Sequence, residues 1–304
     1  MEPERYFVFG AGYSGKAFAA GRPPGTPVTG TTRRAANISA LRAAGLEPLL
    51  FDGMSATDDL KAALSEVTHL LVSVAPDDDG DPVLRTLGGD IETAMPALRW
   101  IAYLSTVGVY GDHQGGWIDE TAECRPVSTR SKRRVEAEAA WQDMAARRGV
   151  PLAVLRLSGI YGPGRNALLN LAEGKARRLV KPGQVFNRIH VADIAGALWH
   201  LAERRTGGIF NVTDDLPAPP QDVVAYAAEL MGMEPPPEIP FETADLSPMA
   251  RSFYGENKRV SNAAIRATGY AFRYPDYRQA LSAMWVDGSW RGGSRDGRSP
   301  IRRG

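Results

Sequence analysis

The chain of 304 residues contains a single cysteine, Cys124, and no apolar run of the roughly 18 residues that a membrane span requires. One thiol cannot form an internal disulfide, and this composition is typical of proteins in a reducing compartment. The first strand-like residues begin too early for a signal peptide. We therefore expect a cytoplasmic protein without a membrane partner.

The sequence also lacks an excess of charge of either sign. Its 36 Lys and Arg residues against 35 Asp and Glu residues give a formal net charge of +1. No global field therefore attracts nucleic acid, and we expect no nucleic-acid partner. Basic residues do gather among Gly and Ser in 286–304, which predicts a disordered basic tail. A weak anion-binding arm is the alternative for this tail.

Histidine is scarce, with four residues in the chain. His69, His113 and His200 do not have the spacing of metal ligands. The acidic run at 77–81 also lacks the spaced ligand pattern of a cation loop. We therefore expect no metal site, and we interpret 77–81 as a mobile, solvated loop.

Short apolar runs alternate with amphipathic stretches from Tyr6 to Leu157. This alternation predicts an α/β fold, a Rossmann-type doubly wound parallel sheet that binds its ligand at the carboxyl edge. The expected strands are 6–9, 27–30, 48–51, 69–74, 100–105 and 152–157, and the expected helices are 14–20, 34–44, 58–64, 83–95 and 129–148.

The pattern changes after Gly162. We expect residues 1–162 to form the dinucleotide-binding Rossmann domain, and residues 163–285 to form a small C-terminal α/β region that acts as a substrate lid. A strand and a helix within 190–214 return to the Rossmann domain. The rest of the lid region contains a proline-rich loop, one helix near 221–231 and an irregular segment to about Trp285. It looks too sparse to build a core of its own.

The first expected strand runs into Gly10-Ala-Gly12-Tyr13-Ser14-Gly15, with glycines spaced G-x-G-x-x-G before a helix. Gly10 permits the tight turn, Gly12 lets the backbone approach a pyrophosphate, and Gly15 lets the helix pack on the strand. The N–H groups at the helix start, around Tyr13 and Ser14, then point at the phosphates. The motif predicts a dinucleotide-binding site.

The residues after the next strands indicate which dinucleotide binds. The second strand ends in Thr32-Arg33-Arg34, where an acidic residue would favour NAD and where arginines favour a 2′-phosphate. Asp52, after the third strand, is placed to receive the adenine amino group, and Ala75, after the fourth, forms a small-residue wall against the cofactor. We predict NADP as the cofactor, with NAD as the alternative.

Further motifs follow the glycine motif in order along the chain. They are LSTVGVYG at 104–111, Asp119-Glu120, RLSGIYGPG at 156–164, RIHVADIA at 188–195 and GIFNV at 208–212. Together with the glycine motif they resemble the extended short-chain dehydrogenases/reductases of the NAD(P)-dependent nucleotide-sugar epimerase/dehydratase type. The resemblance runs from Tyr6 to about Asp214, and it implies a Rossmann fold and a nicotinamide cofactor.

The resemblance also implies catalytic residues. In this family a Ser or Thr polarises the substrate oxygen, and Thr106 occupies that position. A tyrosine normally stands four residues before a lysine that lowers the pKa of the phenol and binds the nicotinamide ribose. Here the lysine is Lys132, but the tyrosine position is Ser128. A serine hydroxyl cannot replace the phenol, and losing a general acid typically costs about 10²–10⁴ in rate.

Another tyrosine has the spacing of the missing one. Tyr254 lies four residues before Lys258, but no strand feeds this segment, so chance spacing or a lid contact is the favoured explanation. Within the family there is an atypical group of epimerase-like proteins that lack the tyrosine, and this chain resembles that group most.

Candidate substrate residues are Tyr161, Arg165 and Arg188. Arg165 can meet an anionic substrate, and the resemblance implies a role for Arg188, because the corresponding arginine of relatives often faces a substrate diphosphate. His190 and Asp193 of the same motif are interpreted as structural residues that cap and anchor the following helix. We predict an oxidoreductase or epimerase-like enzyme that acts on a small, anionic or sugar-type substrate, as a monomer or homodimer. The alternative is a non-catalytic NADP-binding sensor or regulatory module.

Overall fold

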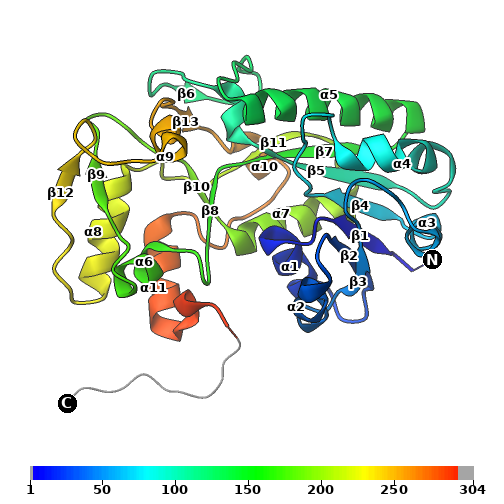
Figure 1. Cartoon of the computed structure of the whole chain (residues 1–304), viewed down its shortest axis with the longest axis horizontal. Helices are drawn as coiled ribbons and strands as arrows, with labels where there is room; N and C mark the ends of the chain where they lie inside the picture. Colours follow the sequence, from blue (N-terminus) through cyan, green and yellow to red (C-terminus); the bar gives the residue numbers. More distant parts are fainter. Residues whose placement is uncertain (1–2, 294–304) are drawn as a thin grey trace.

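The computed structural model describes residues 3–293, and its centre is a seven-stranded sheet in which every neighbouring pair is parallel (Figure 1). The strand order is β11-β7-β5-β4-β1-β2-β3. The strands are β1 (Tyr6–Phe9), β2 (Val28–Thr32), β3 (Glu47–Leu50), β4 (His69–Val72), β5 (Trp100–Thr106), β7 (Leu152–Leu157) and β11 (Gly208–Val212). The predicted Rossmann-type doubly wound sheet is confirmed.

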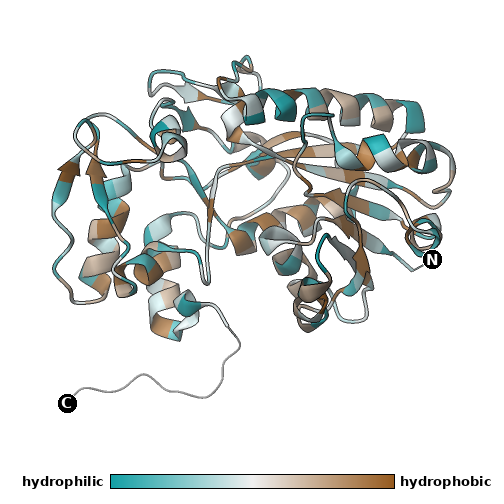
Figure 2. Cartoon of the chain, viewed as in Figure 1, coloured by the Kyte–Doolittle hydropathy of each residue, from teal (hydrophilic) through white to brown (hydrophobic). Residues whose placement is uncertain are grey.

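Helices cover both faces of this sheet because alternate residues of each strand point to opposite sides. Tyr6 and Val8 of β1 belong to the apolar cluster under α1 (Tyr13–Ala20), α2 (Ile38–Ala43) and α7 (Val191–Arg204). Phe7 and Phe9 belong to the opposite cluster, under α3 (Asp58–Ser65), α4 (Pro82–Thr93) and α5 (Thr129–Arg148). Figure 2 shows the resulting hydrophobic strands between helices with hydrophilic outer faces.

The helix α5 has the bounds expected from the sequence. Ser128 is its N-cap and accepts a hydrogen bond from the N–H of Ser131, and Gly149 ends it in the left-handed conformation with φ of 68°. The first-turn aspartates of α3 and the prolines at the starts of α4 and α8 (Pro220–Leu230) are similar helix-start signals. Local chemistry therefore sets these boundaries.

The strand order reverses between β1 and β4, because the chain builds β1, β2 and β3 outward and then returns to place β4 on the other side of β1. At such a switch point the loops after the two strands separate and leave a crevice at the carboxyl edge. The glycine motif follows β1, so it lies at this crevice.

A small lobe follows the sheet and contains more regular structure than we expected. We define it as the elements around a buried cluster that includes Leu168, Ala227, Leu281 and Trp290. The expectation of sparse material without its own core is wrong, and so is the expectation of an irregular segment to about Trp285. The helix α11 (Tyr277–Asp287) was missed because its buried face exists only where α8 packs against it. The elements outside the large sheet are β8 (Gly159–Tyr161), α6 (Ala167–Ala172), β9 (Arg178–Val180), β10 (Arg188–His190), α8, β12 (Glu238–Pro240), α9 (Pro248–Phe253), α10 (Ala263–Ala267), α11 (Tyr277–Asp287) and the short pair β6 (Trp117–Ile118) and β13 (Arg259–Val260).

The expected basic tail also begins later than residue 286. Residues 286 and 287 end α11, and Trp290 lies in a 3₁₀ turn (Ser289–Arg291) with only 3% of its surface exposed. Its carbonyl accepts hydrogen bonds from the side chain of Asn166 at 2.7 Å and from the N–H of Gly164 at 3.0 Å. The prediction of disorder is therefore wrong for 286–293, and its remaining part, 294–304, lies outside the described residues.

Candidate functional site

The glycine turn after β1 has the geometry that phosphate binding needs. Gly10 has a φ of 76°, which disfavours any side chain, and a Cβ there would come within 3.0 Å of Val74. A Cβ on Gly15 would come within 3.0 Å of Val8, so this glycine permits close helix–strand packing. A Cβ on Gly12 would meet nothing closer than the Gly10 oxygen at 3.9 Å, so it would project into open space.

The start of α1 is free to bind an anion. Gly12 is its N-cap, no side chain caps the helix, and the first-turn N–H groups have no intrahelical acceptor. Two hydrogen bonds fix the turn to β2, from Gly10 N to Thr31 Oγ1 at 2.9 Å and from Ala11 N to Thr31 O at 2.9 Å. Thr31 is a positioning residue that we did not predict, although it lies next to Thr32.

A cavity of about 530 Å³ lies over this turn and extends along the ends of β2, β3 and β4. Seven of the predicted cofactor residues line it together with Lys16, Asn37 and Ser73: Gly10, Gly12, Tyr13, Thr32, Arg33, Asp52 and Ala75. Ser14 is buried behind the turn, with 7% of its surface exposed. Arg34 and Lys132 do not line the cavity.

The end of the cavity at β2 carries an unpaired cation. Arg33 is exposed, and no carboxylate of residues 3–293 lies within 4.0 Å of its guanidinium. The hydroxyl oxygen of Thr32 accepts hydrogen bonds from Arg34 N at 3.4 Å and from Asn37 Nδ2 at 3.3 Å, which orders the turn that presents Arg33. This end of the cavity therefore suits a ligand with negative charge.

Asp52 is exposed at the same cavity and remains ionised. Its Oδ1 accepts hydrogen bonds from Met54 N at 2.8 Å and Ser55 N at 3.2 Å, and these two bonds lower the pKa of the carboxyl below its usual value. The carboxylate can still accept a further hydrogen bond from a ligand amino group.

The acidic segment 77–81 is held at three points but stays partly solvated. Asp77 forms an ion pair with Arg85 at 2.8 Å, Asp78 pairs with Arg133, and Asp81 caps α4. The side chains of Asp77 and Asp78 are 48% and 83% exposed, so the expected solvation is confirmed, and the expected mobility stays a prediction. These contacts hold the loop that follows Ala75 beside the cavity.

The residues predicted to be catalytic lie around the start of α5. The hydroxyl of Thr106, at the end of β5, accepts a hydrogen bond from Gly108 N at 3.1 Å. A Cβ on Gly108 would lie 3.1 Å from Ser131 Oγ and 3.4 Å from Thr106 Oγ1, so this glycine separates the two hydroxyl groups. Ser131, which was not among the predicted site residues, therefore lies beside Thr106.

The hydroxyl of Ser128 already has a structural role. It accepts from Ser131 N at 3.1 Å as the helix cap and donates to Ser131 Oγ at 2.9 Å. Lys132 is exposed, and its amine has no hydrogen-bond or ion-pair partner within residues 3–293. The geometry supplies a free amine and two hydroxyl groups here, without a phenol at position 128.

Tyr254 and Lys258 do not form the pair that their spacing suggests. The Lys258 amine bonds to Glu256 Oε2 at 2.6 Å and to Gly111 O at 2.5 Å. Tyr254 is buried against Phe241, with ring centroids 4.8 Å apart. Both residues have packing partners of their own, in line with the favoured explanation of chance spacing or a lid contact.

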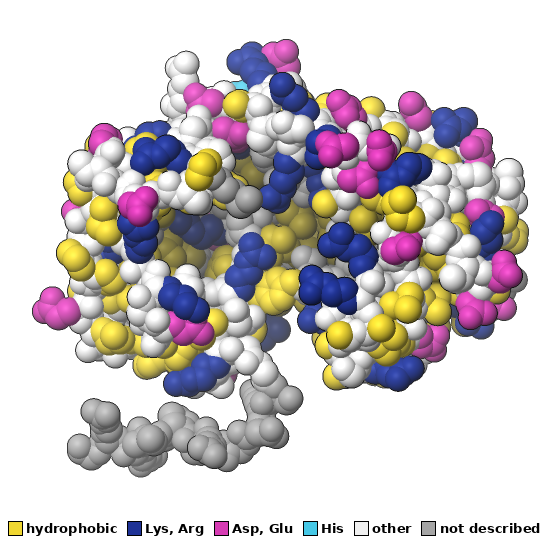
Figure 3. Space-filling model, viewed as in Figure 1, with side chains coloured by type: hydrophobic (Ala, Val, Ile, Leu, Met, Phe, Trp, Pro, Cys, Tyr) yellow, Lys and Arg dark blue, Asp and Glu magenta, His cyan; other side chains and the backbone are white. Residues whose placement is uncertain are grey.

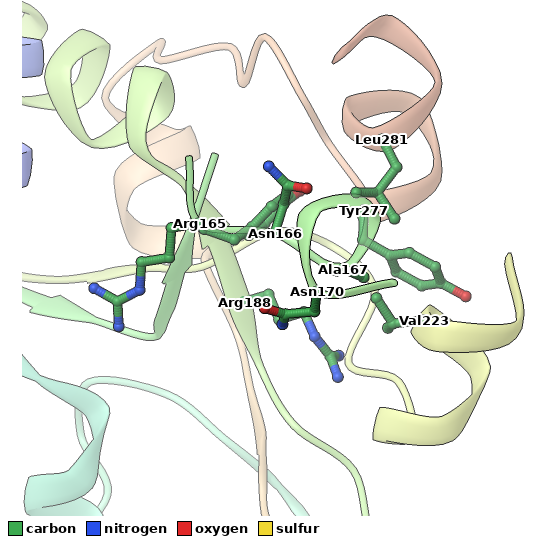
Figure 4. A pocket seen from close by; sticks show the side chains of 9 residues that line it. Arg165, Asn166, Ala167, Asn170, Arg188, Val223, Tyr277 and Leu281 are labelled. Atoms are coloured by element: carbon green, nitrogen blue, oxygen red, sulfur yellow. The ribbon is translucent and has the colours of Figure 1, made fainter. Parts of the chain in front are cut away.

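A second cavity, of about 220 Å³, lies in the small lobe (Figure 4). The three predicted substrate residues, Tyr161, Arg165 and Arg188, all line it. Figure 4 shows the Arg165 side chain extending to the opposite side from Tyr277. The other lining residues are Asn166, Ala167, Asn170, Val223, Tyr277 and Leu281.

Tyr161 and His190 are opposite residues of the parallel strands β8 and β10. Their rings meet edge to face, with centroids 5.4 Å apart. His190 Nδ1 accepts from Ala192 N at 3.2 Å, which confirms its expected role as the cap of α7, and burial lowers its pKa to about 4. Burial also raises the pKa of Tyr161, whose buried hydroxyl has no hydrogen-bond partner among the described residues.

The two cavities are linked through the loop after β8. Tyr13 lines the larger cavity, and its hydroxyl donates to Pro163 O at 2.9 Å, two residues before Arg165. Figure 3 shows a hollow between the two halves of the molecule with Lys and Arg side chains gathered around it. Cationic groups therefore face both cavities.

Within 3–293, no three or more His, Cys, Asp or Glu side chains converge as a metal site would require. No helix in the same range is long and apolar enough to cross a membrane.

A doubly wound parallel sheet with an uncapped glycine turn at its switch point defines a Rossmann-type, NAD(P)-binding fold. Comparisons with known proteins show what the chain is similar to. Residues 92–213 match the model of the NAD-dependent epimerase/dehydratase family. The protein YeeZ of Escherichia coli K12 is 29% identical over 264 residues, which cover 83% of this chain and 89% of YeeZ.

Solved structures agree with this match. A functionally unknown conserved protein of Silicibacter pomeroyi is 48% identical, with a TM-score of 0.84 over 94% of this chain and 99% of that one. The human epimerase family protein SDR39U1, solved with NADPH, is 20% identical and shares the fold, with a TM-score of 0.71 over 93% of this chain and 99% of that one. Over residues 92–213 the chain is therefore similar to the NAD-dependent epimerase/dehydratase family.

Proposed function

We propose that the protein is an NADP(H)-dependent oxidoreductase of the epimerase/dehydratase type that acts on a small anionic substrate without the usual tyrosine. The observation that carries this proposal is the larger cavity, where an uncapped glycine turn at one part and the unpaired Arg33 at another fit a phosphorylated dinucleotide. The space in front of Gly12, which a side chain would fill, supports the same assignment.

Three features favour NADP over NAD. Thr32 stands where an acid would hold both ribose hydroxyls, Arg33 can form a charge-assisted hydrogen bond with a 2′-phosphate, and the similar human structure contains NADPH. Asp52 would accept the adenine amino group, and Ala75 would form part of the wall beside the cofactor. Arg34, which lies outside the cavity lining, would act at most through the long-range field.

The nicotinamide of such a cofactor supplies or accepts hydride. The chain's own residues would do the rest: Thr106 would donate a hydrogen bond to the substrate oxygen, and Lys132 would bind the ribose and add positive charge. The hydroxyl of Ser128 is too weak an acid to protonate an alkoxide at a useful rate. We therefore expect slow turnover, with the substrate held by Arg165 and Arg188 at the second cavity.

A panel of carbonyl compounds tests this proposal. Purified protein with NADPH is offered small 2-oxo acids, matched neutral ketones and nucleotide sugars, and NADPH consumption is followed by its absorbance. We expect turnover with the anionic carbonyls and loss of it in Arg188→Gln. Turnover only with neutral ketones would contradict the substrate assignment.

One observation favours the second candidate, a non-catalytic NADP-binding sensor. The Ser128 hydroxyl is engaged in capping α5, so this position supplies no proton donor. NADPH binding measured by calorimetry, together with no consumption of NADPH on any carbonyl, would favour the sensor. Neither binding nor turnover would reject both candidates.

A further inference from the structure

Arg188 holds a positive charge in the small-lobe cavity without a counter-ion. Its Nη1 donates to the carbonyl oxygens of Phe186 at 2.9 Å and Ala218 at 3.0 Å, which fixes the guanidinium, and the ring of Tyr277 lies 5.9 Å away. No carboxylate of residues 3–293 lies within 4.0 Å of it. Burial lowers the pKa of Arg188, which reflects the cost of enclosing this charge.

Asp214 is the carboxyl with the strongest electrostatic interaction with Arg188. It follows β11, its N–H donates to Arg188 O at 2.7 Å, and only 1% of its surface is exposed. Its Oδ1 accepts from Leu216 N at 3.2 Å, whereas Oδ2 is buried and has no hydrogen-bond partner in the described part of the chain. A charged carboxyl that is buried with one oxygen lacking a hydrogen-bond partner destabilises the folded state, so such a group is expected to be neutral or to have a functional role.

The surroundings of Asp214 keep its carboxyl protonated at neutral pH. Burial raises its pKa to about 8, the charges of Asp215 and Asp276 act in the same direction, and the Leu216 N–H and Arg188 oppose them. Asp276 also caps α11. At pH 7 most Asp214 carboxyls are therefore uncharged, and the charge of Arg188 is not cancelled.

Two other groups on the packed elements face this cluster. Tyr161 on β8 interacts with Asp214, and its pKa is raised, so it stays neutral throughout. Burial also raises the pKa of Asp193 on α7, but three hydrogen bonds oppose that shift, one from Tyr270 OH at 3.0 Å and two from backbone N–H groups. Asp214 is thus the acid whose charge state changes near neutrality.

We propose that Asp214 is the positioning residue of an oxyanion subsite at Arg188. While the Asp214 carboxyl is uncharged, the Arg188 guanidinium is free to bind a small oxyanion. When the carboxyl loses its proton, its negative charge neutralises the guanidinium and the oxyanion is released. This rests on the proposed function, because the oxyanion is understood as part of the substrate. Asn170 and Tyr161 line the same cavity, and the Asn170 side chain can add a hydrogen bond.

The volume of the cavity limits the size of the ligand that can bind. Pockets for drug-sized ligands usually measure about 300–1,000 Å³, whereas this one measures about 220 Å³. A carboxylate or a phosphate on a short carbon chain fits such a space better than a nucleoside diphosphate. A carboxylate and a phosphate are both small oxyanions, and the competition experiment below distinguishes between them.

Calorimetric titration with sulfate tests the proposal, because sulfate keeps its charge between pH 7 and pH 9. If only protein with protonated Asp214 binds, the wild-type affinity should fall about tenfold between these values. Asp214→Asn should bind equally tightly at both, within about twofold. The control is Asp143→Asn, which removes an exposed carboxylate of α5 that lines neither cavity and should show the wild-type fall. Acetate and methyl phosphate then compete with sulfate to identify the preferred oxyanion.

Arg188→Gln should lose the pH-dependent component of sulfate binding and keep any pH-independent binding at the glycine turn. The proposal is overturned if wild-type affinity does not depend on pH, or if Asp214→Asn or Arg188→Gln retains the fall. If Asp214→Asn does not fold, the pH dependence of sulfate binding by the wild-type protein decides the proposal. Absent NADPH binding or turnover would reject the proposed function while leaving this sulfate profile unchanged, so the two failures are distinguishable.

Discussion

Arg156 of β7 and Glu138 of α5 form a buried ion pair, with Nη2 and Oε2 2.7 Å apart and about 5% of each side chain exposed. Glu138 also accepts a hydrogen bond from Ser105, and the Arg156 guanidinium lies 4.8 Å above the Tyr110 ring. The hydrogen bonds and charge of Glu138 raise the pKa of Arg156. The pair therefore fixes α5, which carries Ser131 and Lys132, against the strand that ends at Thr106.

Glu138→Gln should destabilise the protein by about 3–5 kcal/mol, because it leaves a buried guanidinium without its counter-charge. Urea unfolding followed by circular dichroism measures the change. The control is Glu92→Gln, which breaks an exposed pair with Arg147 and should cost less than about 1 kcal/mol. Equal effects of the two variants would show that burial of the pair does not matter.

Arg33→Ala should weaken NADPH binding by roughly 10- to 100-fold, because a charge-assisted hydrogen bond to phosphate contributes about 1.5–3 kcal/mol. NADH binding should change little. Calorimetry with both cofactors measures the preference, and Arg34→Ala, outside the cavity lining, is the matched control with a smaller expected effect. An unchanged preference for NADPH in Arg33→Ala would place the 2′-phosphate elsewhere.

Gly12→Ala should fold normally and bind neither cofactor, because the added Cβ projects into open space that the pyrophosphate needs. Gly89→Ala is the matched control: Gly89 lies inside α4, and its Cβ would meet nothing within 4 Å. That control should keep cofactor affinity and gain about 0.5–1 kcal/mol of stability. Normal binding by Gly12→Ala would contradict the assigned phosphate site.

Ser128→Tyr should place a phenol near Lys132 and raise carbonyl reduction, by less than the roughly 10²–10⁴ of a well-placed acid. Part of any effect comes from losing the helix cap, which costs about 0.5–2 kcal/mol, so Ser128→Ala serves as the control. Steady-state rates with NADPH give the result. A fast wild-type enzyme that Ser128→Tyr inactivates would mean that another group, such as Lys132, carries the proton.

Stability should fall as the pH falls from about 6.5 to about 4, in part because of His190. Its pKa is lowered in the folded protein, so the unfolded chain binds more protons in this window and acid favours unfolding. His190→Asn keeps a helix-capping acceptor without titrating, and should reduce the stability lost across this pH window by about 1–3 kcal/mol. His69, whose pKa burial also lowers to about 4, leaves a residual slope. An unchanged slope in urea unfolding would show that His190 titrates normally when folded.

The sequence by itself determined the sheet and the cofactor turn. Strand and helix periodicity, the Ser128 and Gly149 ends of α5, and the spacing of Gly10, Gly12 and Gly15 all act over a few residues, so each could be recognised without knowing its neighbours in space. The same local rules placed Thr32 at the end of β2 and Arg33 directly after it, because the carboxyl end of a parallel strand lies at the ligand edge.

Only the tertiary structure decided the rest. The helix α11 and the buried Trp290 depend on packing partners from α6 and α8. The carboxyl of Asp214 is buried, with one oxygen unsatisfied, because the chain folds back to place it beside Arg188, which lies 26 residues earlier in the sequence. The hydroxyl of Ser128 could serve either chemistry or capping, and its distance to Ser131 assigned it to the helix end. Burial and electrostatic environment are sums over residues distant in sequence, which is why no local pattern encodes them.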